Sequence, residues 1–166
     1  MRRFFSRRPE IVVTQHDPDD LPGMADIHAK SFPQAWSEDD IASMLAASGA
    51  SAWVARIAGG GAGRPLGFVI ARTAADEAEI ITVASDPAHR RAGVGRALME
   101  HAIRELQRER VTRLLLEVSE RNLAAIALYR SLGFVRIGER KGYYASHAGP
   151  GGAQPPAALV MARDLR

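Results

Sequence analysis

Hydrophobic and polar positions alternate with two different periods along this chain, and the two periods predict strands and helices in mixed order. Short runs rich in β-branched and other apolar residues, bounded by Gly, Pro or Asp, are typical of strands. We expect strands at residues 10–15, 51–58, 66–73, 77–84, 112–119, 134–141 and 157–164. The run at 112–119 is apolar enough to lie in the centre of a sheet.

Four further segments are typical of helices, at residues 19–31, 38–47, 94–109 and 123–132. Ser37 and Asn122 are good N-cap residues for the second and the fourth of them. Apolar residues of the third recur at four-residue steps and form a stripe that we expect to be buried: Val94, Leu98, Ala102 and Leu106. The order of elements predicts an α/β (α+β) fold in one domain, with a mixed central sheet of about seven strands flanked by about four helices.

The composition fits one domain of 166 residues with 46% hydrophobic residues. We expect a basic flexible tail at residues 1–9 and the folded domain at 10–166. The absence of cysteine excludes disulfides and a cysteine nucleophile, and the five histidines lack metal-ligand spacing, so we expect no metal centre. No apolar run is long enough to span a membrane, and we expect a cytoplasmic protein.

The net charge of +3 comes almost entirely from arginine, since Lys30 and Lys141 are the only lysines. A basic excess suits an anionic ligand, although solubility alone also explains it. The segment Arg90–Arg96 offers a place for such a ligand between a predicted strand and a predicted helix. Glycine lets a backbone approach a ligand closely, and the free amides and dipole of a helix start attract phosphate. Its residues are Arg90, Arg91, Ala92, Gly93, Val94, Gly95 and Arg96. A P-loop would need Lys followed by Ser or Thr, and a dinucleotide loop would need a small residue at Leu98. An ordinary glycine-rich helix start is the remaining alternative.

The pattern Arg90-x-x-Gly93-x-Gly95 resembles the signature of the GCN5-related N-acetyltransferase (GNAT) family. The similarity continues in chain order through Asp86-Pro87, Leu116-Glu117-Val118, Asn122-x-x-Ala125-x-x-Leu128-Tyr129, Leu132-Gly133-Phe134, Tyr143-Tyr144 and Val160-Met161. Ala35-Trp36-Ser37-Glu38 is similar to an element of the RimI-like branch, whose members acetylate the N-terminal alanine of a small-subunit ribosomal protein. The resemblance implies a GNAT-type fold and acetyl-CoA as cosubstrate.

Amine acetylation needs a base, donors for an oxyanion and an acid for the leaving thiolate. Glu117 interrupts an apolar strand, and strand alternation places it on one face with Leu115 and Ser119. It is our candidate base, and a structural glutamate paired with an arginine is the alternative. Tyr129 is the candidate acid, and a core tyrosine is the alternative.

The resemblance assigns further residues to the cofactor and the acceptor. It implies that Val83, Ala84 and Ser85 pair with the pantetheine arm and that the Val83 N–H binds the oxyanion. Asn122 is an N-cap by its position and a pantetheine contact by resemblance. Trp36, Tyr143 and Tyr144 are candidate acceptor-side residues.

The expected acceptor is the N-terminal α-amine of a protein, by resemblance a ribosomal protein. Gln154-Pro155-Pro156 departs from the acidic element that precedes the last strand in the RimI-like branch. Two alternatives therefore stay open, namely a small-molecule amine such as a polyamine or an aminoglycoside, and a non-catalytic acyl-CoA-binding module. We expect no direct nucleic-acid role, no membrane partner, and a monomer or weak homodimer.

Overall fold

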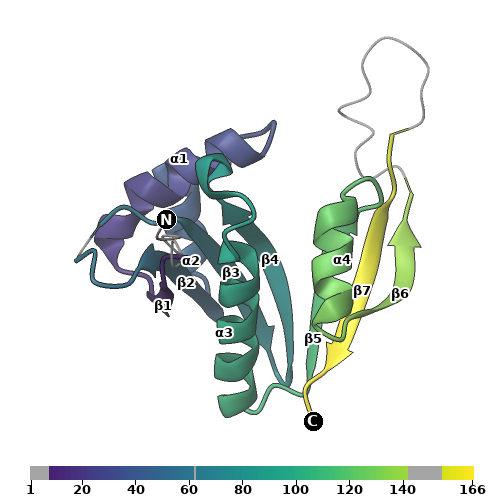
Figure 1. The fold of residues 1–166 in the computed structure, drawn as a ribbon. Helices are drawn as coiled ribbons and strands as arrows, with labels where there is room; N and C mark the ends of the chain where they lie inside the picture. Colours follow the sequence, from purple (N-terminus) through teal and green to yellow (C-terminus); the bar gives the residue numbers. More distant parts are fainter. Residues whose placement is uncertain (1–7, 62, 142–154) are drawn as a thin grey trace, which may run out of the picture. The chain divides into compact units, whose positions relative to one another are not determined.

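The seven predicted strands all form and join into one mixed sheet in the computed structural model, which describes residues 8–61, 63–141 and 155–166 (Figure 1). The strands are β1 (Ile11–Gln15), β2 (Ala50–Ile57), β3 (Gly67–Ala74), β4 (Glu77–Ser85), β5 (Arg113–Ser119), β6 (Val135–Arg140) and β7 (Ala158–Asp164). Their order in the sheet is β1-β2-β3-β4-β5-β7-β6. The β4–β5 pair is parallel, whereas β1–β2, β5–β7 and β6–β7 are antiparallel. The predicted fold class is confirmed.

Four α-helices and two short 3-10 turns complete the described part of the chain. The helices are α1 (Leu21–Ser31), α2 (Glu38–Leu45), α3 (Val94–Arg108) and α4 (Leu123–Ser131), and the turns are η1 (Pro18–Asp20) and η2 (Pro87–His89). The predicted start of the first helix is wrong by two residues, because Asp19 and Asp20 form η1 instead. Asp17 and Asp20 close a capping box around that turn, in which the Asp17 N–H donates to Asp20 Oδ2 at 2.8 Å. The predicted N-caps Ser37 and Asn122 both accept backbone N–H groups.

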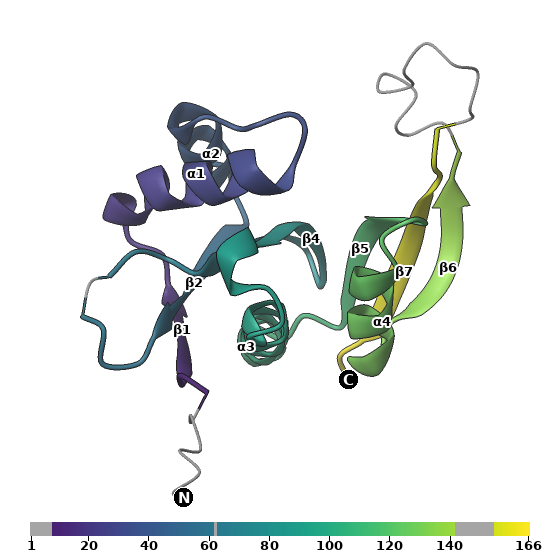
Figure 2. The same cartoon turned by 45° about the horizontal axis from the view of Figure 1, so that its top comes forward.

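Contacts divide the described chain into two compact units. The first holds the described residues of Met1–Ala71 and Thr82–Ala102, and the second those of Arg72–Ile81 and Ile103–Arg166. Within the first, α1 and α2 lie side by side in both views (Figures 1 and 2). Within the second, α4 lies alongside β5 and β7. The predicted stripe of α3 is buried at all four of its positions. The expected boundary between the tail and the domain at residues 9 and 10 stays a prediction, since residues 1–7 are outside the described part.

A carboxylate on α1 joins that helix to the segment before β3. Asp26 pairs with Lys30 one turn later, at 2.8 Å, and with the Arg64 guanidinium. The hydrogen bond from Lys30 is the main cause that lowers the pKa of Asp26, and the charge of Arg64 adds to it. Gly23 makes room for the same contact, because a Cβ there would lie 2.9 Å from Pro65 Cδ.

Gly67 at the start of β3 lies in very close contact with its neighbours. A Cβ at this position would lie 2.7 Å from both the Ala84 carbonyl oxygen and Val94 Cγ1, and 3.1 Å from Leu98 Cδ1. The lack of a side chain therefore allows the first turn of α3 and the end of β4 to pack directly on β3. An isolated glycine within a strand often marks such a close approach.

We expect Gly67→Ala to lower the free energy of unfolding by about 2 kcal/mol, because the backbone oxygen of Ala84 cannot yield as a flexible side chain would. Urea unfolding followed by circular dichroism measures the change. Gly138→Ala in β6 is the matched control, since a Cβ there meets nothing within 4 Å. Equal stability of Gly67→Ala and wild type would show that the three contacts relax without cost.

None of the helices in the described residues has the length and apolar character that a membrane span requires.

Candidate active site

The predicted phosphate loop, residues 90–96, follows β4 and η2 and ends in the first turn of α3. Asp86 caps η2 by accepting the Ala88 N–H at 2.9 Å, and the chain then turns through Arg91 and Gly93, with φ angles of 64° and 83°. The first helical hydrogen bond runs from the Ala97 N–H to the Gly93 carbonyl at 3.0 Å. The amides before Ala97 therefore have no acceptor within the helix. The loop has the backbone geometry of an anion-binding helix start.

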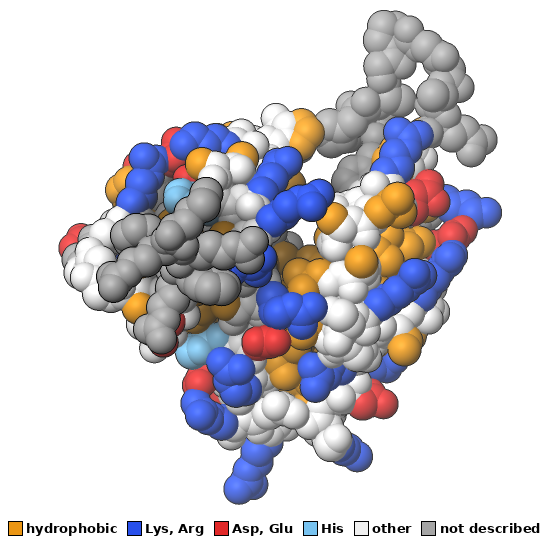
Figure 3. All heavy atoms as spheres, viewed as in Figure 1, with side chains coloured by type: hydrophobic (Ala, Val, Ile, Leu, Met, Phe, Trp, Pro, Cys, Tyr) orange, Lys and Arg blue, Asp and Glu red, His pale blue; other side chains and the backbone are white. Residues whose placement is uncertain are grey.

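Positive charge surrounds this loop. Arg90, Arg91 and Arg96 are exposed, and Arg96 forms a 3.6 Å ion pair with Glu100 one helical turn later. Lys and Arg side chains are also prominent on the face drawn in Figure 3. An exposed ion pair of this kind contributes little to stability.

The carboxyl end of β4 extends beyond its register with β5. That register runs from Glu77↔Arg113 to Ile80↔Leu116, while β4 continues to Ser85. Ala84 is buried, and its predicted neighbours Val83 and Ser85 are half-buried. All three residues belong to the same unit as the phosphate loop.

Glu117 lies in the middle of β5 with its side chain mostly covered. The strand alternates as predicted, since Leu116 and Val118 are buried and Glu117 is half-buried on the opposite face. Its Oε1 pairs with Arg140 Nη2 at the end of β6, at 2.9 Å. The Glu117 side chain is 20% exposed and that of Arg140 is 60% exposed. Glu117 is thus paired with an arginine, as the alternative interpretation from the sequence expected. The Arg140 guanidinium orients the Glu117 carboxylate.

Tyr129 lies on the buried face of α4, in the same unit as Glu117. Its ring packs edge-on against Phe134, with 5.9 Å between centroids. Burial raises the pKa of Tyr129 to about 12. The phenol therefore keeps its proton throughout the neutral and mildly alkaline range.

Asn122 has the N-cap role that its position predicted. Its Oδ1 accepts the Ala125 N–H at 3.2 Å, at the start of α4. The residue is exposed.

Trp36 is half-buried between α1 and α2 and contacts a histidine that the sequence analysis did not select. Its ring stacks on His28 with 4.2 Å between centroids and an interplanar angle of 13°. The other candidate acceptor-side residues, Tyr143 and Tyr144, lie outside the described residues.

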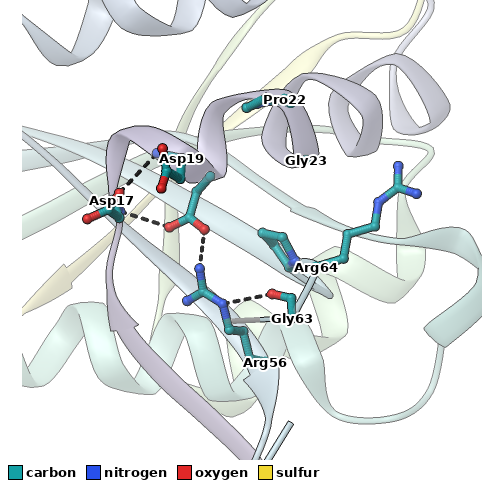
Figure 4. A pocket seen from close by; sticks show the side chains of 9 residues that line it. Asp17, Asp19, Pro22, Gly23, Arg56, Gly63 and Arg64 are labelled. Carbon is teal, nitrogen blue, oxygen red and sulfur yellow. Dashed lines mark hydrogen bonds and ion pairs between the residues drawn. The ribbon is translucent and has the colours of Figure 1, made fainter. Parts of the chain in front are cut away.

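A separate hollow of about 520 Å³ lies between η1, β2 and the segment before β3 (Figure 4). Two of the charged side chains that line it, Arg56 and Asp20, are paired with each other. Arg56 donates from Nε to the Gly63 carbonyl at 3.0 Å and pairs through Nη2 with the buried Asp20. Arg56 Nη1 also donates to Thr14 Oγ1 on β1 at 3.2 Å. These bonds fasten β1, η1 and β2 together, and we interpret the hollow as structural.

In the described part of the chain, no three His, Cys, Asp or Glu side chains gather in a way that could hold a metal ion.

Three residues of interest were not selected from the sequence: Gly67, Arg140 and His28. The strand glycine was a usable signal for Gly67. An acidic residue inside an apolar strand indicates a cation partner, but the chain offers many arginines, and the choice of Arg140 required the strand order. His28 carried no signal, because a histidine on a helix is compatible with many surroundings.

Comparisons with known proteins agree with the fold and with the motif. The family model described as "Acetyltransferase (GNAT) family" matches residues 21–134. The chain is 36% identical over 132 residues to the [ribosomal protein bS18]-alanine N-acetyltransferase of Escherichia coli K12, which covers 80% of this chain and 86% of that protein. It is 43% identical over 75 residues to the N-alpha-acetyltransferase RimI of Mycobacterium tuberculosis, a match to 45% of this chain and 46% of that one.

A solved structure gives the same result in three dimensions. The crystal structure of the ribosomal-protein-S18-alanine N-acetyltransferase from Escherichia coli aligns with a TM-score of 0.80 and 33% identity, over 94% of both chains. The family model, the extended sequence identity and the structural alignment lead to one conclusion: this chain belongs to the acetyltransferase (GNAT) family.

Proposed function

We propose that this protein transfers the acetyl group of acetyl-CoA to the N-terminal α-amine of a protein, with a ribosomal protein that begins with alanine as the preferred acceptor. The observation that carries the proposal is the 36% identity, over most of both chains, to an enzyme named for acetylating the alanine of ribosomal protein bS18. The phosphate loop supports the choice of acetyl-CoA as cosubstrate. Its turn at Gly93 and the free amides of α3 suit a pyrophosphate.

The reaction that we propose is direct attack of a neutral amine on the thioester carbon. A C–N bond forms, the C–S bond breaks, and the amine loses one proton while the leaving sulfur gains one. Glu117 takes the amine proton, directly or through a water, and the Val83 N–H stabilises the oxyanion. An α-amine suits this route because its usual pKa is about 8, below that of a lysine side chain. A larger fraction of the α-amine is therefore neutral at pH 7.

The carboxyl end of β4 is the proposed binding strand for pantetheine. Backbone groups of Val83, Ala84 and Ser85 lie past the last β4–β5 register pair, Ile80↔Leu116. Amides of an extended ligand can pair with such a strand as an added strand does. The Asn122 side chain would contribute a further contact to the same arm.

The raised pKa of Tyr129 refines its proposed role as the acid. A phenol with a pKa of about 12 is a weaker acid than a thiol with a pKa of about 8.5. Full transfer of its proton to a free thiolate is therefore uphill. We propose that Tyr129 donates a hydrogen bond to the sulfur as negative charge develops there, and transfers the proton only while the C–S bond breaks.

We expect Tyr129→Phe to lower kcat about 100-fold with little change in the Kd for acetyl-CoA, because the lost hydrogen bond forms mainly in the transition state. Stopped-flow or steady-state thiol release measures kcat, and calorimetry measures Kd. An unchanged kcat would leave Tyr129 as a core residue only.

The same variant has a second readout, which does not depend on catalysis. The pKa of Tyr129 is about 12 in the folded chain, against the usual value of 10.0. Between these values the unfolded phenol releases its proton and the folded one does not. Stability contributed by the neutral phenol is thus fully present below pH 10 and is lost as the pH rises toward 12. Wild type should lose about 2 to 3 kcal/mol over this window relative to Tyr129→Phe, by urea unfolding.

The acceptor is tested with peptides that copy the N-terminus of the ribosomal protein. We expect acetyl transfer to a peptide that begins with Ala, and none to the same peptide with its α-amine formylated. Mass spectrometry locates the acetyl group. Transfer to polyamines or aminoglycosides alone would favour the small-molecule alternative. Binding of acetyl-CoA with no turnover on any amine would favour the non-catalytic module.

A further inference from the structure

The carboxyl end of α1 carries a buried histidine enclosed by two aromatic rings. His28 is 3% exposed. The Trp36 ring stacks on it at 4.2 Å between centroids, and the Phe32 ring lies at 4.5 Å with an interplanar angle of 31°. The segment 32–36, which connects α1 to α2, thus closes around one imidazole.

A hydrogen bond fixes the state of that imidazole. The backbone N–H of Trp36 donates to His28 Nδ1 at 3.1 Å. Because Nδ1 is the acceptor, the ring proton of the neutral form resides on Nε2. A second proton on Nδ1 would turn the acceptor into a donor that faces another donor. Protonation of His28 is therefore incompatible with this bond.

The same end of α1 is tied to the strand that we propose for the cofactor. Ser31 Oγ donates to the Ile27 carbonyl at 2.8 Å and lies 3.4 Å from the carbonyl oxygen of Ser85, the last residue of β4. His28, Trp36 and Ser85 all belong to the first unit. The base of the segment 32–36 is thus adjacent to the carboxyl end of β4.

We propose that His28 is a positioning residue, which sets the Trp36 side chain and the segment 32–36 for the acceptor N-terminus and releases them when it is protonated. The inference rests on the proposed function, since it assigns this histidine to the acceptor side of the same reaction. His28 touches neither reacting atom. It acts through the two contacts with Trp36, the ring stack and the backbone hydrogen bond.

The electrostatic surroundings of His28 determine the pH at which it releases Trp36. Burial is the cause that lowers the pKa of His28 below its usual 6.5. Among the described elements, η1, α2 and η2 pack against α1, and Arg64 from the segment before β3 pairs with Asp26 on α1. Together with α1 and the N-caps of the two 3-10 turns, they carry these charged or titratable groups: Asp17, Asp19, Asp20, Asp26, Lys30, Glu38, Asp39, Asp40, Arg64, Asp86 and His89. The lowered pKa means that the neutral ring and its bond persist at pH 7 and are lost as the pH falls below 6.5.

Two variants separate the contacts in a kinetic test. His28→Asn keeps a side-chain acceptor near the place of Nδ1 and removes the ring, whereas His28→Phe keeps a ring and removes the acceptor. We expect His28→Phe to raise the KM for the alanine peptide about tenfold, and His28→Asn to restore part of that loss, with kcat and the KM for acetyl-CoA nearly unchanged. A KM for the peptide that stays at the wild-type value in both variants would overturn the proposal.

The pH dependence gives a second kinetic readout. Protonation of the acceptor amine lowers the rate of every variant at acid pH, so each profile is divided by that of His28→Asn. We expect the ratio of wild type to His28→Asn to fall as the pH is lowered below 6.5, because only wild type has a titrating group at this position. A flat ratio down to pH 5 would overturn the release.

Tryptophan fluorescence tests the pair without any acetyl transfer. A protonated imidazole stacked on an indole quenches the indole fluorescence. As the pH falls, wild type should therefore lose tryptophan emission with an apparent pKa below 6.5, and His28→Asn should not. The chain offers a matched control, because Trp53 lies edge-on to His101 at 6.0 Å between centroids. His101→Asn should keep the acid transition of wild type. If no peptide is acetylated at all, the proposed function fails, while this titration still decides whether His28 holds Trp36. A transition that survives His28→Asn would overturn the pairing.

Discussion

Glu117→Gln should lower kcat by about 100-fold to 10 000-fold, because the amide cannot take the proton of the attacking amine. The substitution keeps the size of the side chain, so the Kd for acetyl-CoA should change little. The rate of acetyl transfer to the alanine peptide between pH 6 and pH 9 measures the loss. Full activity across this range would exclude Glu117 as the base.

The ion pair with Arg140 makes a second variant necessary. Glu117→Gln also removes the 2.9 Å contact with Arg140 Nη2, so a loss of rate has two possible origins. Arg140→Met removes the contact and keeps the carboxylate. We expect it to lower kcat far less than Glu117→Gln, whereas equal losses would assign the effect to orientation. Glu139→Gln is the surface control, since Glu139 pairs with Arg136 on the same strand and with Lys141 just after it.

Gly93→Asp should weaken acetyl-CoA binding by a factor on the order of 100, because it places a negative charge near the proposed pyrophosphate site. The backbone has a φ of 83° at this residue, so any side chain also strains the turn. Isothermal calorimetry with CoA measures the affinity, and kcat at saturating acetyl-CoA should stay close to that of wild type.

A glycine in another loop, with a similar backbone conformation, separates a local effect on the phosphate loop from general destabilisation. Gly59 has a φ of 75°, and a Cβ there meets nothing within 4 Å, as at Gly93. Gly59→Asp therefore carries the same strain and charge in the segment that follows β2. We expect it to bind CoA like wild type. Comparable losses in both variants would mean that general destabilisation, rather than the phosphate loop, explains the effect.

The strands and helices were predictable from local patterns because their signals act over a few residues. The four-residue stripe from Val94 defined the buried face of α3, and alternation around Glu117 defined the two faces of β5. The error at Asp19 and Asp20 came from a competing local interaction, since the Asp17–Asp20 capping box closes a 3-10 turn before α1 begins.

Only those features of the candidate site that depend on local backbone conformation were predictable from the sequence. The Gly93 turn and the Asn122 cap follow from residue type and position. The partner of Glu117 does not, because it depends on β7 lying between β5 and β6 in the sheet. Likewise, the contact between His28 and Trp36 depends on how the segment 32–36 folds back on α1. Such pairings arise from tertiary packing, which no local pattern encodes.

The scarcity of lysine bears on the chemical durability of a protein that handles a reactive thioester. Acyl groups migrate spontaneously onto neutral primary amines, whereas a guanidinium, charged at every biological pH, resists this damage. Lys30 is partly occupied by the carboxylate of Asp26 at 2.8 Å, which leaves Lys141, 85% exposed, as the more accessible of the two ammonium side chains. A surface whose cations are nearly all arginine attracts an anionic cosubstrate while offering it few places for self-modification.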